Sequence, residues 1–247
     1  MSGVLKHMME VKEARGAGYV ILVDPDMYDL AELSEQAELL SQYADLLFVG
    51  GSLCVRHDFG EAVSRVKQSS RVPVVIFPGD ATQVSSHADA ILFLSLVSGR
   101  NSDLLIGEHV KAAPRIRRYR LETIPVAYIL VESGETTSVQ FMSQSLAIPR
   151  RKSEIASAHA LAGEYLGMKL VFLEGGSGAQ MHVPLKMIES VREYVSIPLI
   201  VGGGIKSPEE AGAIVRSGAS FIVTGDVIEK NGSETILREF TSAVHAG

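Results

Sequence analysis

The feature that most restricts the fold of this sequence is a recurrence of short apolar runs along the whole chain. Most of these runs are rich in valine, isoleucine and phenylalanine, and none alternates strictly between apolar and polar residues. This pattern is typical of parallel strands that are covered on both faces. There are eight runs: YVILV (19–23), LLFV (46–49), VVIF (74–77), AILFL (90–94), VAYILV (126–131), LVFL (170–173), LIV (199–201) and FIVT (221–224).

Amphipathic segments separate many of these runs. After Ser153, apolar residues repeat at helical spacing up to Gly167, a residue type that commonly ends a helix. Pro184 can begin another helix, and Ser207-Pro208-Glu209-Glu210 reads as a capping box that begins a helix ending near Gly218. We therefore expect strands and helices to alternate, which is the arrangement of βαβ units with a parallel sheet.

Eight strands in 247 residues favour a closed barrel. We predict an α/β fold consisting of a single (β/α)8 TIM barrel, as one domain over residues 1–247. The third crossover, from Pro78 to Ala90, is short and rich in turn residues. We therefore expect the third helix of the barrel to be shortened or missing.

The composition excludes several classes of protein. The chain is 46% hydrophobic and 21% charged, as in ordinary soluble proteins, and its net charge of −6 weighs against general binding to nucleic acids or anionic membranes. The single cysteine, Cys54, cannot form an intramolecular disulfide and fits a reducing compartment. No apolar run approaches the roughly 18 residues that span a bilayer, and the N-terminus is not a signal peptide. We expect a cytoplasmic protein with at most peripheral membrane contact.

One segment, residues 98–124, is the least regular part of the sequence and holds a group of basic residues. It contains Lys111 and four arginines between positions 115 and 120. One interpretation is a solvated helix face, and the other is a rim that attracts an anionic substrate.

Glycine-rich loops follow the last two predicted strands, at the end of the barrel where active sites lie. Gly203 and Gly204 follow the seventh run, and Gly225 and Asp226 follow the eighth. Glycine lets backbone N–H groups approach a phosphate closely, and a following helix N-terminus favours an anion. We predict a phosphate-binding site there, with the side chain of Asp226 pointing away from it.

Carboxylates follow two other strands. Glu174 stands at the end of the sixth run and precedes Gly175-Gly176-Ser177-Gly178, so it is a candidate proton acceptor, or alternatively a solvated residue of a turn. Asp24 and Asp26 follow the first run, and Ser52 follows the second. Oxygen ligands of this kind suit Mg²⁺, although the two aspartates can also cap the next turn. The seven histidines show no spacing typical of metal ligands.

Several longer motifs occur in order along almost the whole chain. They are VDPD (23–26), FVGGS (48–52), FPGD (77–80), ADAILFLSLVSGRN (88–101), LIGEHV (105–110), LGMKLVFLEGGSGA (166–179), IVGGGIKSPEEA (200–211) and IVTGDVIE (222–229). Together they resemble the geranylgeranylglyceryl phosphate synthase family, which includes the bacterial heptaprenylglyceryl phosphate synthases.

The resemblance implies a Mg²⁺-dependent prenyltransferase. Such an enzyme joins a long-chain prenyl diphosphate, geranylgeranyl or the longer heptaprenyl, to the sn-3 hydroxyl of sn-glycerol 1-phosphate. The reaction forms the first ether bond of an ether lipid and releases diphosphate. The resemblance also implies a homo-oligomer, either a dimer or a hexamer.

The resemblance assigns roles to residues as well. Asp24 and Ser52 would hold Mg²⁺ with the diphosphate, and Glu174 would be the catalytic residue that faces the attacking hydroxyl. The residues that would bind sn-glycerol 1-phosphate are Phe172, Leu173, Glu174, Gly175, Gly176, Ser177, Gly178, Gly203, Gly204, Gly225 and Asp226.

The sequence departs from the family pattern at several positions. Phe172 stands where the family commonly has tyrosine, Gly175 where it often has alanine, and Met27 where it often has lysine. The family also often carries an aromatic residue near Asp103-Leu104. The sequence therefore leaves prenyl length and glycerol geometry open. Two alternatives share the glycine loops, namely a sugar-phosphate isomerase barrel and a barrel that binds a phosphorylated ligand without catalysis.

Overall fold

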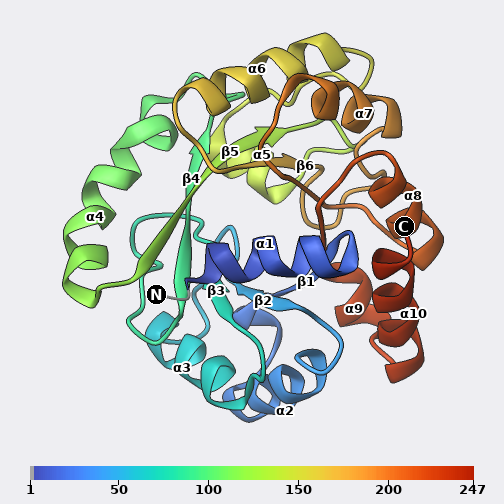
Figure 1. The fold of residues 1–247 in the computed structure, drawn as a ribbon. Coiled ribbons are helices and arrows are strands. Elements are labelled where there is room, and N and C mark those ends of the chain that lie inside the picture. Colours follow the sequence, from blue (N-terminus) through green and yellow to red (C-terminus); the bar gives the residue numbers. More distant parts are fainter. Residues whose placement is uncertain (1–2) are drawn as a thin grey trace.

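The computed structural model describes residues 3–247, without the side chains of residues 230 and 231. Its eight strands are parallel and pair in chain order into a closed barrel, with β8 beside β1 (Figure 1). The predicted TIM barrel and all eight predicted strands are therefore confirmed. The strands are β1 (Gly18–Val23), β2 (Leu46–Val49), β3 (Val74–Ile76), β4 (Ala90–Leu96), β5 (Glu122–Leu130), β6 (Leu170–Glu174), β7 (Leu199–Gly202) and β8 (Phe221–Thr224).

Helices surround the barrel and cover one of its ends (Figure 1). None of the helices in the described part of the chain is long and apolar enough to cross a membrane. A short 3₁₀ helix (Pro25–Met27) follows β1, and a π-helical turn (Asp103–Gly107) leads into α4. The α-helices are α1 (Val4–Arg15), α2 (Leu30–Leu40), α3 (Phe59–Ser69), α4 (Glu108–Tyr119), α5 (Ser138–Ser143), α6 (Ser153–Tyr165), α7 (Leu185–Tyr194), α8 (Pro208–Arg216), α9 (Asp226–Asn231) and α10 (Glu234–His245).

The helix starts follow the sequence signals, with one correction at α8. The hydroxyl of Ser207 accepts a hydrogen bond from the N–H of Glu210, as an N-cap does. The carboxylate of Glu210, however, accepts from the N–H of Lys206 at 2.6 Å and not from that of Ser207. The predicted capping box is therefore wrong in its second half, because the carboxylate reaches one residue further back.

The barrel is closed at one end and open at the other. The helix α1 lies across the N-terminal ends of the strands (Figure 1), and its Met8 packs with Phe172 and Phe221 inside the barrel. The next residue after Phe172, Leu173, belongs instead to the layer between the strands and the outer helices. Successive strand residues face opposite sides. Because α1 covers the N-terminal ends of the strands, the open end of the barrel is the one at their carboxyl ends.

The third helix of the barrel is missing, as predicted. Residues 77–89, all of them described, connect β3 to β4 as a loop without a helix (Figure 1). On the outer face of these strands, Ile76 and Ile91 pack instead against Ala112 and Ile116 of α4. The loop that takes the place of this helix contacts α4 directly, since the N–H of Ala81 donates to the carboxylate of Glu108 at 2.8 Å.

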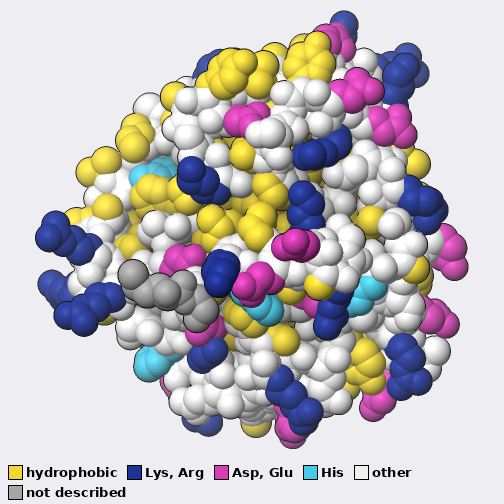
Figure 2. All heavy atoms as spheres, in the orientation of Figure 1, with side chains coloured by type: hydrophobic (Ala, Val, Ile, Leu, Met, Phe, Trp, Pro, Cys, Tyr) yellow, Lys and Arg dark blue, Asp and Glu magenta, His cyan; other side chains and the backbone are white. Residues whose placement is uncertain are grey.

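The basic segment forms the exposed face of α4. Figure 2 shows Lys and Arg side chains gathered at the edge of the molecule where α4 ends. Helices of a β/α barrel run back along the strands, so Arg115 and Arg118 lie toward the end opposite the open mouth. This position supports the interpretation as a solvated helix face.

Candidate active site

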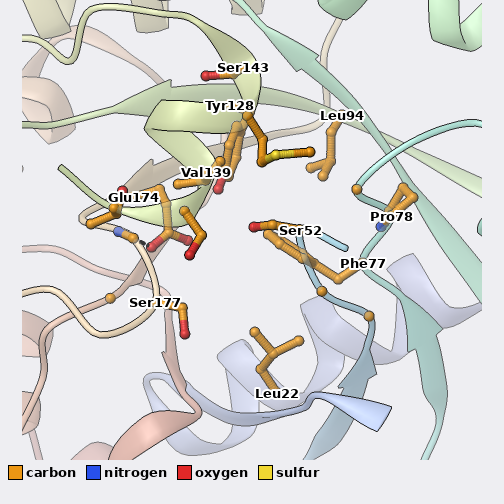
Figure 3. Close-up of a pocket in the computed structure, with 18 of the residues that line it drawn as sticks. Leu22, Ser52, Phe77, Pro78, Leu94, Tyr128, Val139, Ser143, Glu174 and Ser177 are labelled. Atoms are coloured by element: carbon orange, nitrogen blue, oxygen red, sulfur yellow. Dashed lines mark hydrogen bonds between the residues drawn. The ribbon is translucent and has the colours of Figure 1, made fainter. Parts of the chain in front are cut away.

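A cavity of 1220 Å³ opens at the carboxyl ends of the strands. Figure 3 shows Glu174 and Ser177 on one side of it, Ser52 and Phe77 facing them, and Leu22 below. Loops that follow strands around the barrel meet here, at the end where active sites of this fold lie.

Most of the predicted site residues line this cavity. Leu173 and Gly175 do not. The side chain of Leu173 packs in the outer layer. The N–H of Gly175 donates to the carbonyl of Gly202 at 2.9 Å, and the carbonyl of Gly175 accepts from the hydroxyl of Ser133 at 2.6 Å. The predicted residues that do line the cavity are Asp24, Ser52, Phe172, Glu174, Gly176, Ser177, Gly178, Gly203, Gly204, Gly225 and Asp226.

Glu174 is a buried carboxyl group at the end of β6, not a solvated residue of a turn. Only 7% of the residue is exposed, and its Oε1 accepts a hydrogen bond from the N–H of Gly176 at 2.5 Å. Burial raises the pKa of Glu174 to about 7, while the bonds from Gly176 and the hydroxyl of Tyr128 lower it and the charge of Asp226 raises it. A carboxyl group that titrates near neutrality is suited to accept a proton.

Two consecutive glycines after β7 allow the loops around Glu174 to pack closely. Gly203 has a φ of +78°, and a side chain there would meet the carboxylate of Glu174 and the backbone of Gly176. Gly204 has a φ of +70°, and a Cβ would lie 2.6 Å from the carbonyl of Met181. Both positions require glycine for conformation and for space. The glycines predicted to bind phosphate therefore also form the wall behind Glu174.

Asp226 faces the loop after β6, and the prediction that its side chain points away is wrong. Its carboxylate accepts a hydrogen bond from the hydroxyl of Ser177, and it lies 3.2 Å from where a Cβ on Gly178 would stand. Asp226 is the first residue of α9, so its side chain extends from the start of that helix toward a loop that offers a hydroxyl donor. Its backbone stays beside Gly225 at the cavity wall.

Asp24 and Ser52 lie next to each other at the ends of β1 and β2. The carboxylate of Asp24 accepts from the N–H of Asp26 at 3.0 Å, and its other oxygen lies 2.9 Å from where a Cβ on Gly51 would stand. Burial raises the pKa of Asp24, the bond from Asp26 lowers it, and the charges of Asp26 and Asp226 raise it further. A half-buried carboxylate close to other acids, with the hydroxyl-bearing Ser52 in the wall of the same cavity, is a donor set that fits Mg²⁺.

The described residues contain no group of three or more acidic, histidine or cysteine side chains arranged to hold a metal. A Mg²⁺ ion at Asp24 and Ser52 would therefore need further ligands from substrate oxygens and water. Asp26 has another role. Its carboxylate accepts from the N–H groups of Val55 and Arg56, at 2.7 and 3.0 Å, and so fixes the loop after β2.

Two site residues were missed in the sequence. Tyr128 lies in β5, its hydroxyl bonds Glu174, and its ring lies edge-on to that of Phe172 at 5.4 Å. Thr137, after β5, packs against Gly176 and lines the cavity. The signal for Tyr128 was present, because it is the one residue with a hydroxyl in the apolar run 126–131.

The cavity continues as an apolar groove into the space left by the missing third helix. Ile91 and Phe93 line it from the outer face of β4, and Ala112 and Ile116 line it from α4. His109 also lines it, and burial lowers the pKa of that imidazole, which favours its neutral form. The cavity therefore joins a polar, glycine-rich part to an apolar part.

Known proteins resemble this chain over nearly its full length. The model of the PcrB family matches residues 9–244. A protein of Chitinophaga pinensis named geranylgeranylglyceryl phosphate synthase is 42% identical over 95% of this chain and 93% of its own length. A protein of Thermococcus kodakarensis with the same name is 41% identical over 99% of this chain and 97% of its own length.

Solved structures agree with these relatives. The crystal structure of (S)-3-O-geranylgeranylglyceryl phosphate synthase from Thermoplasma acidophilum, in complex with its substrate sn-glycerol-1-phosphate, has a TM-score of 0.93 and 33% identity, and covers 100% of both chains. An N-acetylmannosamine-6-phosphate 2-epimerase from Clostridium perfringens, covering 96% of both chains, has a TM-score of 0.60 at 16% identity, and so shares the fold alone. The chain thus belongs to the PcrB family, together with proteins named geranylgeranylglyceryl phosphate synthase.

Proposed function

We propose that this protein is a prenyltransferase that joins geranylgeranyl diphosphate to the sn-3 hydroxyl of sn-glycerol 1-phosphate. The names of relatives about 40% identical, and the substrate bound in the Thermoplasma acidophilum structure, support this reaction. The product is an ether-linked lipid precursor, and diphosphate leaves.

One observation carries the proposal, namely that a single cavity joins the two environments that this reaction needs. Its polar part holds Glu174 beside the loops of Gly176, Gly203 and Gly225, and its apolar part runs along α4. A glycerol phosphate fits the first environment, and a long hydrocarbon chain fits the second. A sugar-phosphate isomerase has no use for the apolar part.

The chemistry of the chain follows from this arrangement. Glu174 accepts the proton of the sn-3 hydroxyl while that oxygen forms a bond to C1 of the prenyl group and the bond from C1 to the diphosphate oxygen breaks. Tyr128 holds the carboxylate of Glu174 through its hydroxyl. The glycine loops position the acceptor, which is the main way to help a weak alcohol nucleophile. No covalent intermediate with the protein is needed.

Asp24 and Ser52 would hold Mg²⁺ with the diphosphate. The ion would supply charge neutralisation of the leaving group. We predict that Asp24→Asn lowers turnover at least 100-fold and weakens Mg²⁺-dependent binding of prenyl diphosphate, because the amide is neutral. Titration of activity against Mg²⁺ concentration measures both effects, and activity within about twofold of wild type would contradict the assignment. Glu38→Gln, a change of an exposed acid on α2, is the matched control.

The direct test is mass spectrometry of the product. The enzyme is given sn-glycerol 1-phosphate, Mg²⁺ and an equal mixture of farnesyl, geranylgeranyl and heptaprenyl diphosphates. We expect geranylgeranylglyceryl phosphate to dominate. A heptaprenyl product would support the prenyl transfer but show that heptaprenyl diphosphate is the donor. The absence of an ether product from any donor would contradict the proposed function. The expected homo-oligomer and cytoplasmic location stay predictions, and light scattering tests the first.

A further inference from the structure

The charges in the cavity are unfavourable for the substrates proposed above. Both substrates are polyanions, yet the cavity wall is acidic. Lys206 is the one lysine or arginine among the described residues that line it. The acidic residues of the wall are Asp24, Asp80, Asp103, Glu108, Glu174, Asp226 and Glu229.

Two of these acids stand at the glycine loops. Asp226 follows Gly225, and Glu174 lies against Gly203. A phosphate monoester carries between one and two negative charges near neutral pH. Like charges at a few ångströms repel each other most where water is excluded. Backbone N–H groups carry only partial positive charges, so a cation beside the glycine loops would strengthen binding of the acceptor phosphate.

Lys206 is placed to supply that cation. It comes two residues after Gly204, in the loop between β7 and α8, and its side chain is exposed at the cavity wall. Its Nζ donates a hydrogen bond to the carbonyl of Gln180 at 2.8 Å. An ammonium group has three N–H donors, so this bond leaves capacity for phosphate oxygens. The backbone N–H of Lys206 is fixed by Glu210 at 2.6 Å.

We propose that Lys206 binds the phosphate of sn-glycerol 1-phosphate directly, as the cationic member of the acceptor site. This inference rests on the proposed function, which it deepens by naming the residue that offsets the acidic wall. A flexible ammonium suits this task because it acts as a compact point charge that can move between Gln180 and the phosphate.

A purely structural role for Lys206 makes different predictions. The segment Gln180–His182 packs against Gly204 and is held on another side by Arg150, whose Nη1 donates to the carbonyl of His182 at 2.8 Å. If Lys206 only ties this segment down, removing the Arg150 bond should weaken acceptor binding in the same way. Arg150 is not among the residues that line the cavity. A change of Arg150 therefore tests the role of holding the segment in place without changing the charge of the cavity wall.

The test is calorimetric binding of sn-glycerol 1-phosphate, and of inorganic phosphate, to wild type and four variants at one ionic strength. Lys206→Gln should weaken sn-glycerol 1-phosphate about 10- to 100-fold, the usual range for losing one hydrogen bond to a charged group. Lys206→Arg should stay within about threefold of wild type. Arg150→Gln and Lys186→Gln, an exposed lysine of α7 outside the cavity, should stay within about twofold.

Steady-state kinetics complete the test. For Lys206→Gln the KM for sn-glycerol 1-phosphate should rise by the same factor, with the KM for the prenyl diphosphate unchanged. A loss of acceptor affinity below fivefold, or an equal loss in Arg150→Gln, would overturn the proposal. If wild type makes no product from sn-glycerol 1-phosphate, the proposed function fails instead, and the phosphate affinities of wild type and Lys206→Gln still decide the role of Lys206.

Discussion

At the scale of single residues, the site depends on one carboxyl group that is kept away from water. Glu174 is buried in the wall of the cavity, and its partners are the N–H of Gly176 and the hydroxyl of Tyr128. Burial favours the neutral acid and the hydrogen bonds favour the carboxylate. The balance of these effects places the pKa of Glu174 at about 7, close to the neutral pH at which a general base is most effective.

We predict that Glu174→Gln lowers kcat about 10²- to 10⁴-fold, the usual contribution of general-base catalysis. The amide keeps the size of the side chain but cannot accept the proton. Stopped-assay kinetics measure kcat, and binding of prenyl diphosphate should stay unchanged because Asp24 and Ser52 are intact. A fall of less than fivefold would show that positioning alone drives the reaction.

The raised pKa of Glu174 also predicts how stability depends on pH. The folded pKa of about 7 exceeds the unfolded value near 4.5, so this group favours folding below pH 4.5 and loses that contribution as the pH rises through 7. Glu174→Gln has no such loss. Urea unfolding should therefore show the variant gaining about 2–3 kcal/mol relative to wild type between pH 4.5 and pH 8. An equal difference at both pH values would contradict the assigned burial effect.

At the scale of elements, the loop that replaces the third helix creates the apolar groove. The inner side of α4 places Ala112 in the wall of this groove, in the same apolar cluster as Ile91, and its methyl group takes up little of the space there. The neighbouring Ala113 is exposed and points away from the groove, since consecutive residues of a helix lie about 100° apart around its axis. The two alanines therefore form a matched pair on one turn of α4.

We predict that Ala112→Phe raises the KM for geranylgeranyl diphosphate at least tenfold and shifts the preference toward farnesyl diphosphate, because the ring fills space that the prenyl chain needs. The KM for sn-glycerol 1-phosphate should not change. Ala113→Phe should behave as wild type. Competition between the two donors, followed by mass spectrometry, measures the shift. Equal effects of both variants would place the prenyl chain elsewhere.

At the scale of the whole molecule, the end opposite the site is held together by a buried carboxylate. Asp45, after α2, accepts hydrogen bonds from the N–H of Tyr19 at 2.8 Å, from Arg15 at 2.8 Å and from His245 at 2.9 Å. These partners belong to β1, α1 and α10, so one side chain connects the two terminal helices to the barrel. This network lies at the closed end, away from the cavity.

We predict that Asp45→Ala lowers the free energy of unfolding by about 2–4 kcal/mol, because the N–H of Tyr19 loses its partner in the core. The kcat at a permissive temperature should stay within about twofold of wild type. Guanidinium unfolding measures the loss. Glu38→Ala, which removes an exposed ion pair with Arg71 at 3.5 Å, should cost less than about 1 kcal/mol. A large drop in kcat for Asp45→Ala would mean that the two ends of the barrel are coupled.

The sequence by itself determined the elements of this protein and the end of the barrel that carries the site. The eight strands follow from local apolar runs, the missing third helix from a short crossover of turn residues, and Glu174 from its place directly after a strand. These signals are local, since each depends on a few neighbouring residues. In a parallel barrel the ends of all strands meet at one mouth, so local order was enough to bring Asp24, Ser52 and Glu174 together.

Only the tertiary structure decided which side chains face each other inside that mouth. Tyr128 reaches Glu174 from the neighbouring strand, the carboxylate of Asp226 accepts a hydrogen bond from Ser177, and Lys206 donates to the carbonyl of Gln180. Leu173 and Phe172 are neighbours in sequence, yet they pack in different layers. Contacts of this kind depend on strand register and on loops from distant parts of the chain. No local pattern specifies them, because they form only when the closed barrel brings those segments within a hydrogen bond of each other.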